Sequence, residues 1–190
     1  MSVRCVTPAL SGLGFDVARI AVWFIVAGVI WGRGHVEAPP ERLPDEAPSI
    51  ITASYFTPIP PDVQRIGISR GLPRGLREYR RYRKLAPGPW FRSAPARVYL
   101  DLYTKQLAGL DPARVVDELE AIADGRTAAL CCFESAHEIG LSRRFCHRHI
   151  AARWLEDRIG IEVPELGAPA DFDPWGVLRR LKIDPPSFVL

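Results

Sequence analysis

Two short groups of reactive side chains lie fourteen residues apart in the C-terminal half of the chain. The first is Cys132 to Glu134 (CFE), and the second is Cys146 to Arg148 (CHR). A thiol beside an imidazole can act as a nucleophile with its base, a carboxylate can transfer a proton, and a guanidinium can bind an anion. We therefore predict a catalytic site that contains Cys132, Glu134, Cys146, His147 and Arg148.

The two groups depend on a strand and a helix to bring them together. Thr127 to Phe133 (TAALCCF) is an unbroken apolar run, which is typical of a parallel strand buried on both faces. A loop from Ser135 to Phe145 leads into an amphipathic helix that ends at Gly160. In open α/β sheets ligands bind beyond the carboxyl ends of the strands, so we expect the site where Glu134 leaves the apolar run.

The cysteines and histidines differ in their sequence contexts. Cys131 and Cys132 point to opposite faces of a strand, and we expect Cys131 in the core. Cys146 stands at a helix start beside an imidazole and a guanidinium, which predicts the more acidic and more reactive thiol of the site. His137 and His149 are expected on the surface.

The remaining pattern predicts the fold. Strands are expected at Ile50 to Phe56 and Arg65 to Ser69, a helix at Ala96 to Leu110, a second helix capped by Asp111 and stopped by Gly125, and a last short strand that starts at Ile161 to Val163. This order is typical of an α/β single domain, with a mostly parallel sheet and helices packed on its faces.

Composition narrows the class of protein. The chain has 190 residues, of which 47% are apolar and 25% charged, and this balance suits one soluble globular domain. Its four cysteines lack the dense spacing of a disulfide scaffold, which favours a reducing, cytoplasmic location. No Walker loop, G-x-G-x-x-G, H-E-x-x-H or C-x-x-C motif occurs, so the chemistries that depend on these motifs lack support.

The two ends of the chain differ from its middle. Residues 1–35 form an apolar N-terminal extension whose longest uninterrupted run, Ile20 to Gly32, is shorter than the roughly 20 residues of a membrane span. Three interpretations stay open: an accessory helix, a membrane anchor, or a start codon assigned too far upstream. Residues 36–49 read as a proline-rich linker, 50–166 as the domain, and 167–190 as a proline-rich tail.

Positive charge is concentrated in one segment. The net charge is only +3, yet basic residues greatly outnumber acidic ones between Arg65 and Arg92. The candidate anion-binding residues are Arg70, Arg74, Arg77, Arg80, Arg81, Arg83 and Lys84. With the aromatic side chains nearby, this segment suits phosphate tracking and base stacking, or else it is simply a solvated basic loop.

The two motif groups, on a strand and a helix separated by a loop, resemble the signature of the domain of unknown function 488 (DUF488) family, in its short bacterial and phage-like members. Further similar segments follow in the same order: 52–56 (TASYF), 66–73 (IGISRGLP), 82–87 (YRKLAP), 99–103 and 160–165 (GIEVPE). The resemblance covers roughly residues 50 to 166, and it implies no established function. The chain departs from the family pattern in its longer loop between the motifs (SAHEIGLSRRF).

Three functions are compatible with these residues. The first is an enzyme acting on a nucleotide, a nucleic acid or another phosphorylated substrate through the Cys, His, Arg and Glu site. The second is a metal-binding protein in which Cys132, Cys146 and His147 hold zinc or iron and Glu134 completes or orients the set. The third is a nucleic-acid-binding module without chemistry that uses the arginine-rich segment.

Overall fold

The computed structural model describes residues 48–76, 79–141 and 144–189. The N-terminal extension, nearly all of the linker, and Arg77 of the arginine-rich segment lie outside these residues. Within them, no helix has the length and apolar character needed to cross a membrane. The apolar run at 20–32 falls outside the described part of the chain.

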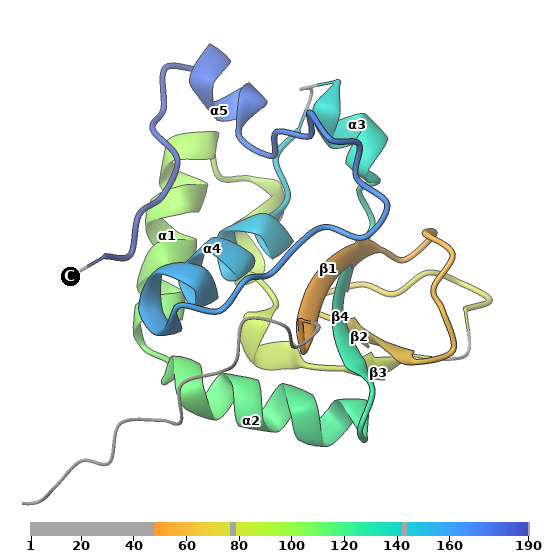
Figure 1. Cartoon of the computed structure of the whole chain (residues 1–190). Coiled ribbons are helices and arrows are strands. Elements are labelled where there is room, and N and C mark those ends of the chain that lie inside the picture. Colours follow the sequence, from red (N-terminus) through yellow and green to blue (C-terminus); the bar gives the residue numbers. More distant parts are fainter. Residues whose placement is uncertain (1–47, 77–78, 142–143, 190) are drawn as a thin grey trace, which may run out of the picture. The chain divides into compact units, whose positions relative to one another are not determined.

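A four-stranded sheet forms the centre of the domain (Figure 1). Its strands are β1 (Ile50–Ser54), β2 (Val63–Gly67), β3 (Arg80–Arg81) and β4 (Thr127–Cys132). They lie in the order β1-β4-β2-β3, and every neighbouring pair is parallel. The carboxyl ends of β1, β4 and β2 therefore meet at one edge of the sheet, and the first reactive group begins there with the last residue of β4.

The register aligns these three strand ends closely. Ser54 of β1 pairs with Cys132 of β4, and Gly67 of β2 pairs with Cys131. β1 and β4 begin where the sequence predicts strands, whereas β2 begins two residues earlier than the expected Arg65.

Within the described residues, three long helices and two short ones accompany the sheet. They are α1 (Ala96–Ala108), α2 (Pro112–Ala123), α3 (Ala136–Gly140), α4 (His147–Ile159) and α5 (Gly176–Arg180), and two 3-10 turns lie at Arg83–Leu85 and Pro89–Arg92. α4 packs against both α1 and α2 (Figure 1). The predicted single-domain α/β fold is thereby confirmed.

The two faces of the sheet are covered differently. Ile50, Ile66 and Leu130 share one apolar core with the buried side chains of α1, α2 and α4. On the other face, Ala53 and Cys131 belong to a smaller cluster against which loop side chains pack. The long helices thus contribute their buried side chains to the first face, and Cys131 is a core residue as expected.

Local capping explains where the long helices begin and end. Asp111 Oδ1 accepts hydrogen bonds from the backbone N–H groups of Ala113 and Arg114, at 3.0 and 3.4 Å. α4 ends at Gly160, whose φ of 70° lies in the left-handed region that glycine adopts most easily. Both predicted boundaries are confirmed.

The segment between α4 and the tail is not a strand, and the prediction that one starts at Ile161 to Val163 is wrong. Only an isolated bridge forms, between Thr52 and Glu165. Thr52 donates its N–H to the carbonyl of Pro164 at 2.8 Å, while Leu166 donates to the carbonyl of Thr52. Because proline has no N–H to donate, it cannot extend a regular ladder at this point.

Residues after 166 pack onto the domain. Leu178 of α5 is fully buried, and Phe188 is nearly so, in the core shared with the long helices. The backbone N–H of Phe188 also donates to Asp157 of α4 at 2.9 Å. The proline-rich segment expected as a tail therefore forms part of the compact domain.

Candidate functional site

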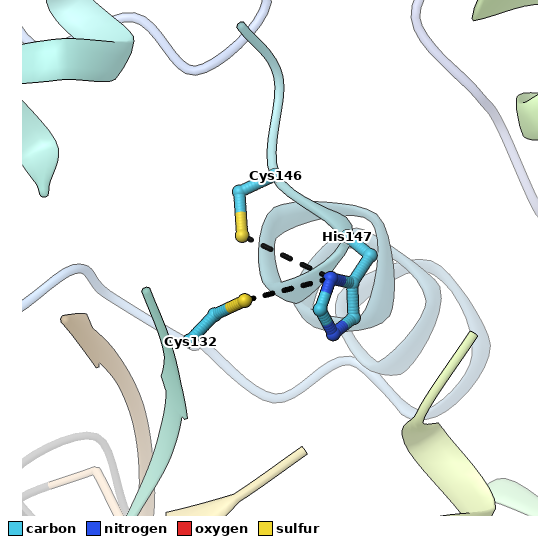
Figure 2. Close-up of side chains that lie close together, drawn as sticks. All are labelled: Cys132, Cys146 and His147. Carbon is cyan, nitrogen blue, oxygen red and sulfur yellow. Dashed lines mark hydrogen bonds between the residues drawn. The ribbon is translucent and has the colours of Figure 1, made fainter. Parts of the chain in front are cut away.

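Cys132, Cys146 and His147 converge at the carboxyl edge of the sheet (Figure 2). Cys132 is the last residue of β4, Cys146 is the N-cap of α4, and His147 is the first residue of that helix. His147 Nδ1 lies 3.7 Å from Cys132 Sγ and 4.0 Å from Cys146 Sγ. All three side chains are buried. The strand and helix thus join the two reactive groups as the sequence predicts.

The imidazole of His147 is held in one orientation. Its Nε2 lies 3.0 Å from the carbonyl oxygen of Ile68, which directly follows β2. A carbonyl only accepts hydrogen bonds, so Nε2 must carry the proton. The ring of Tyr103 also packs edge-on against the imidazole at 5.7 Å between centroids. In its neutral form, His147 therefore presents the lone pair of Nδ1 to the two sulfur atoms.

Glu134 supplies a carboxylate beside the thiols. Cys146 Sγ donates to Glu134 Oε2 at 3.1 Å. Although burial opposes it, hydrogen bonds from the Cys132 and Cys146 thiols lower the pKa of Glu134 below its usual value. The carboxylate therefore stays ionised and available to accept a proton at neutral pH.

Cys146 is less acidic than its place at a helix start predicts. Burial raises the pKa of the Cys146 thiol well above its usual value, and the neighbouring Cys132 sulfur adds to this effect. The nearby Arg148 charge and the His147 hydrogen bond oppose the shift without reversing it. Burial of the charge therefore opposes the Cys146 thiolate that the helix start is expected to favour in the free protein.

Arg148 forms hydrogen bonds that tie the site together. Its side chain is fully buried and donates to both carboxylate oxygens of Glu165, at 2.9 and 3.0 Å. Nη1 donates to the backbone carbonyl of Glu134 at 2.6 Å and to Cys146 Sγ at 3.4 Å. Since its donors already have these partners, Arg148 fits a positioning role better than that of an anion clamp.

His149 belongs to the same buried network. Only 5% of the residue is exposed, and its Nε2 lies 3.0 Å from Glu165 Oε2. The expected surface position is wrong for His149, because Glu165 offers it a partner inside the domain. His137 is exposed, as predicted. Although burial opposes it, His149 and Arg148 lower the pKa of Glu165 to about 2.

A pocket of about 770 Å³ opens beside the cluster, at the carboxyl ends of β2 and β4. Cys132, Glu134, Cys146 and His147 line its reactive side. Its other walls carry three arginines, Arg70, Arg92 and Arg144, and several aromatic rings, among them Phe91, Tyr99 and Phe133. The pocket thus joins nucleophilic and basic atoms to a positively charged wall.

A comparison with protein-family models identifies the family of the chain. The DUF488-N3a family model, described as the active DUF488-N3 subclade, matches residues 50–159. This match covers more than half of the chain. The protein belongs to the DUF488 family. No curated protein and no solved structure matches the chain.

In this DUF488 protein the arginine-rich segment is divided among several places. Arg70 lines the pocket, whereas Arg80 lines a separate hollow with Arg65 and Arg126. The other members of the predicted set are also dispersed. Arg81 donates to the carbonyl of Arg70, and Lys84 Nζ donates to both carboxylate oxygens of Glu118 at 2.7 Å. Arg74 and Arg83 are exposed, and Arg77 lies outside the described residues.

Sequence reasoning did not assign roles to Arg92, Arg144 or Glu165. Arg144 lies in the long loop between the motifs, where no periodicity marks the pocket side. Glu165 ends one of the segments that resemble the DUF488 family, and this similarity was the available signal for its role. The structure adds the reason, since Glu165 holds both Arg148 and His149 in place.

Proposed function

We propose that this DUF488 protein is an enzyme that acts on a phosphorylated, nucleotide-sized substrate. The observation that supports this most is the single pocket that Cys132, Glu134, Cys146 and His147 share with three arginines. Its volume of about 770 Å³ falls within the range of small-molecule sites. The description of the matching family model as an active subclade also supports an enzyme.

The arginine wall favours an anionic ligand. Arg70, Arg92 and Arg144 are exposed and line the pocket, so their guanidinium groups can reach a phosphate placed there. The guanidinium groups of Arg70 and Arg92 lie over the Phe91 ring, at 5.7 and 5.2 Å from its centroid. This packing limits their movement, and the partly exposed Phe133 ring lines the same pocket. A phosphate attached to a flat organic group suits this combination.

The opposite wall provides the chemistry. Glu134 is ionised and lies within hydrogen-bonding distance of a thiol. A carboxylate in this state can take a proton from an attacking group, provided that the substrate reaches it in the pocket. Arg148 donates to the Glu134 carbonyl and to Cys146, and so holds these two residues in a fixed position relative to each other.

The placement of positive charge favours a pocket ligand over a polynucleotide that follows the surface. Lys84 is paired with Glu118 on α2, and Arg80 belongs to a different hollow from Arg70. Over the part of this segment that the structure describes, charge divided in this way does not form a continuous phosphate track. Binding of an oligonucleotide in preference to a mononucleotide would contradict the proposal.

The test compares ligand binding by the full-length protein and matched arginine variants. Calorimetry with inorganic phosphate, nucleoside monophosphates and a single-stranded oligonucleotide identifies the ligand class. Arg92→Gln and Arg144→Gln should each weaken mononucleotide binding by about tenfold or more, since each removes a charge-assisted hydrogen bond. Arg83→Gln is the matched control, because it removes the same charge from an exposed side chain that does not line the pocket.

Turnover provides the second part of the test. Glu134→Gln should retain mononucleotide binding and lose product formation. Phosphorus NMR and chromatography measure the product. Equal losses of binding in Arg83→Gln and Arg92→Gln, or no binding of any phosphorylated ligand, would overturn the proposal.

A further inference from the structure

We propose that Cys132, Cys146 and His147 form a three-ligand site for a divalent transition-metal ion, preferentially zinc, whose fourth position opens into the pocket. Their donor atoms all lie within 4.8 Å of one another, and all three residues are buried. The ion's catalytic role rests on the proposed function, whereas its binding does not depend on the substrate.

The distances between donor atoms suit a tetrahedral ion. With bonds of about 2.3 Å to sulfur and 2.0 to 2.1 Å to nitrogen, ligands at tetrahedral angles stand about 3.6 Å apart. His147 Nδ1 lies 3.7 Å from Cys132 Sγ and 4.0 Å from Cys146 Sγ (Figure 2). Both separations are within about half an ångström of the liganded value, so small side-chain movements suffice.

The contacts behind the donor atoms are those that metal ligands need. A ligating histidine usually donates its other N–H to a carbonyl or carboxylate, which fixes the ring and its tautomer. Here Nε2 of His147 has the Ile68 carbonyl at 3.0 Å. Arg148 Nη1 donates to Cys146 Sγ at 3.4 Å, a contact that stabilises a thiolate.

The charge balance of the cluster also favours a cation. Cys132 and Cys146 are both buried, and Cys146 Sγ lies 3.1 Å from the carboxylate oxygen Oε2 of Glu134. A divalent ion would stabilise both thiolates directly, because it replaces the lost solvation with two short bonds.

Glu134 falls outside the group of three mutually close donors, although it adjoins them. Sites with three protein ligands keep a position for water, which is the arrangement of catalytic rather than structural zinc. All three ligands and Glu134 line the pocket, so a water bound there would have this carboxylate as its proton acceptor.

Cys131 provides a matched control for the ligand assignment. It is adjacent to Cys132 in sequence and equally buried, but it packs with Ala53 and Tyr55 on the opposite face of the sheet. Replacing either cysteine removes one buried thiol from β4. Only Cys132 would lose a bond to the ion.

The experiment uses full-length protein that is reduced, stripped of metal and titrated with cobalt(II), followed by displacement with zinc. Wild type and Cys131→Ala should bind one ion per chain, with thiolate-to-cobalt charge-transfer absorption and the intense visible bands of tetrahedral cobalt. Cys132→Ser, Cys146→Ser and His147→Gln should weaken binding by more than the 10- to 100-fold typical of losing an outer contact. Circular dichroism establishes that each variant is folded.

The wild-type spectrum decides the matter even where a variant fails to fold. Wild type without charge-transfer absorption, or Cys131→Ala with the same loss as Cys132→Ser, would overturn the metal site. Cobalt bands that persist while no phosphorylated ligand binds would uphold the metal site and reject the proposed substrate class. Normal nucleotide binding without cobalt bands would do the reverse.

Discussion

Nε2 of His147 lies 3.0 Å from the carbonyl oxygen of Ile68, so the first residue of α4 is anchored to the end of β2. Parallel pairing places that end beside β4, where Gly67 is the partner of Cys131. The anchored ring then directs Nδ1 toward Cys132, the next residue of β4. The reactive cluster therefore depends on sheet register as well as on the two sequence motifs.

The pKa values of His147 and His149 should be shifted in opposite directions in the metal-free protein. Burial alone would lower the pKa of His147, but Cys146, the Ile68 carbonyl and Glu134 raise it above its usual 6.5. Burial, with a contribution from the Arg148 charge, lowers the pKa of His149 despite its contact with Glu165. NMR of protein labelled with ¹⁵N-histidine measures both values and the tautomers. A neutral His147 with its proton on Nδ1 would contradict the structure.

Cys146 should react slowly with alkylating reagents at neutral pH when no metal is bound. Burial and the Cys132 sulfur raise its pKa, so little thiolate is present at pH 7, and the rate should increase as the pH rises. Peptide mapping by mass spectrometry after timed alkylation measures this rate. Its control is the urea-unfolded protein, in which the thiol is no longer buried. Rapid, pH-independent labelling of the native protein would be inconsistent with the buried thiol.

Local signals allowed much of the fold to be predicted. The Asp111 cap, the Gly160 stop and the apolar run of β4 are encoded by neighbouring residues, and each has its predicted structural role. The meeting of Cys132 with Cys146 was also predictable, because a strand end and the following helix start share one edge of a parallel sheet.

Other features depend on contacts between distant segments. His149 is buried because Glu165, sixteen residues later, is held near the sheet through an isolated bridge to Thr52. Neither the bridge nor the pocket side of Arg144 leaves a periodic signal in the sequence. The effect of burial on Cys146 likewise required the folded surroundings, because helix position alone predicts the opposite shift.

Leu178→Ala should destabilise the domain by about 2–5 kcal/mol, the usual cost of truncating a fully buried leucine. Leu178 belongs to α5, in the segment after residue 166, and is packed into the main core. Chemical denaturation measures the change in unfolding free energy. Val189→Ala is the control, since Val189 is 70% exposed and should change stability by no more than about 0.5 kcal/mol. Equal effects of the two substitutions would show that the segment contributes little to the core.

Glu165 should make the stability of the domain depend strongly on acid pH. Its pKa is lowered from 4.5 to about 2, so its stabilisation is complete above 4.5 and is lost as the pH falls from 4.5 toward 2. That shift corresponds to about 3 kcal/mol of unfolding free energy. Glu165→Gln should flatten this part of the curve of unfolding free energy against pH. It should also cost roughly 3–5 kcal/mol at pH 7, because it leaves Arg148 buried without its counter-charge.

Urea unfolding at a series of pH values measures both effects of Glu165→Gln. The control is Glu162→Gln at an exposed position, which is expected within about 0.5 kcal/mol of wild type at pH 7. An acid-side slope that persists unchanged in Glu165→Gln would assign the pH dependence to other carboxylates.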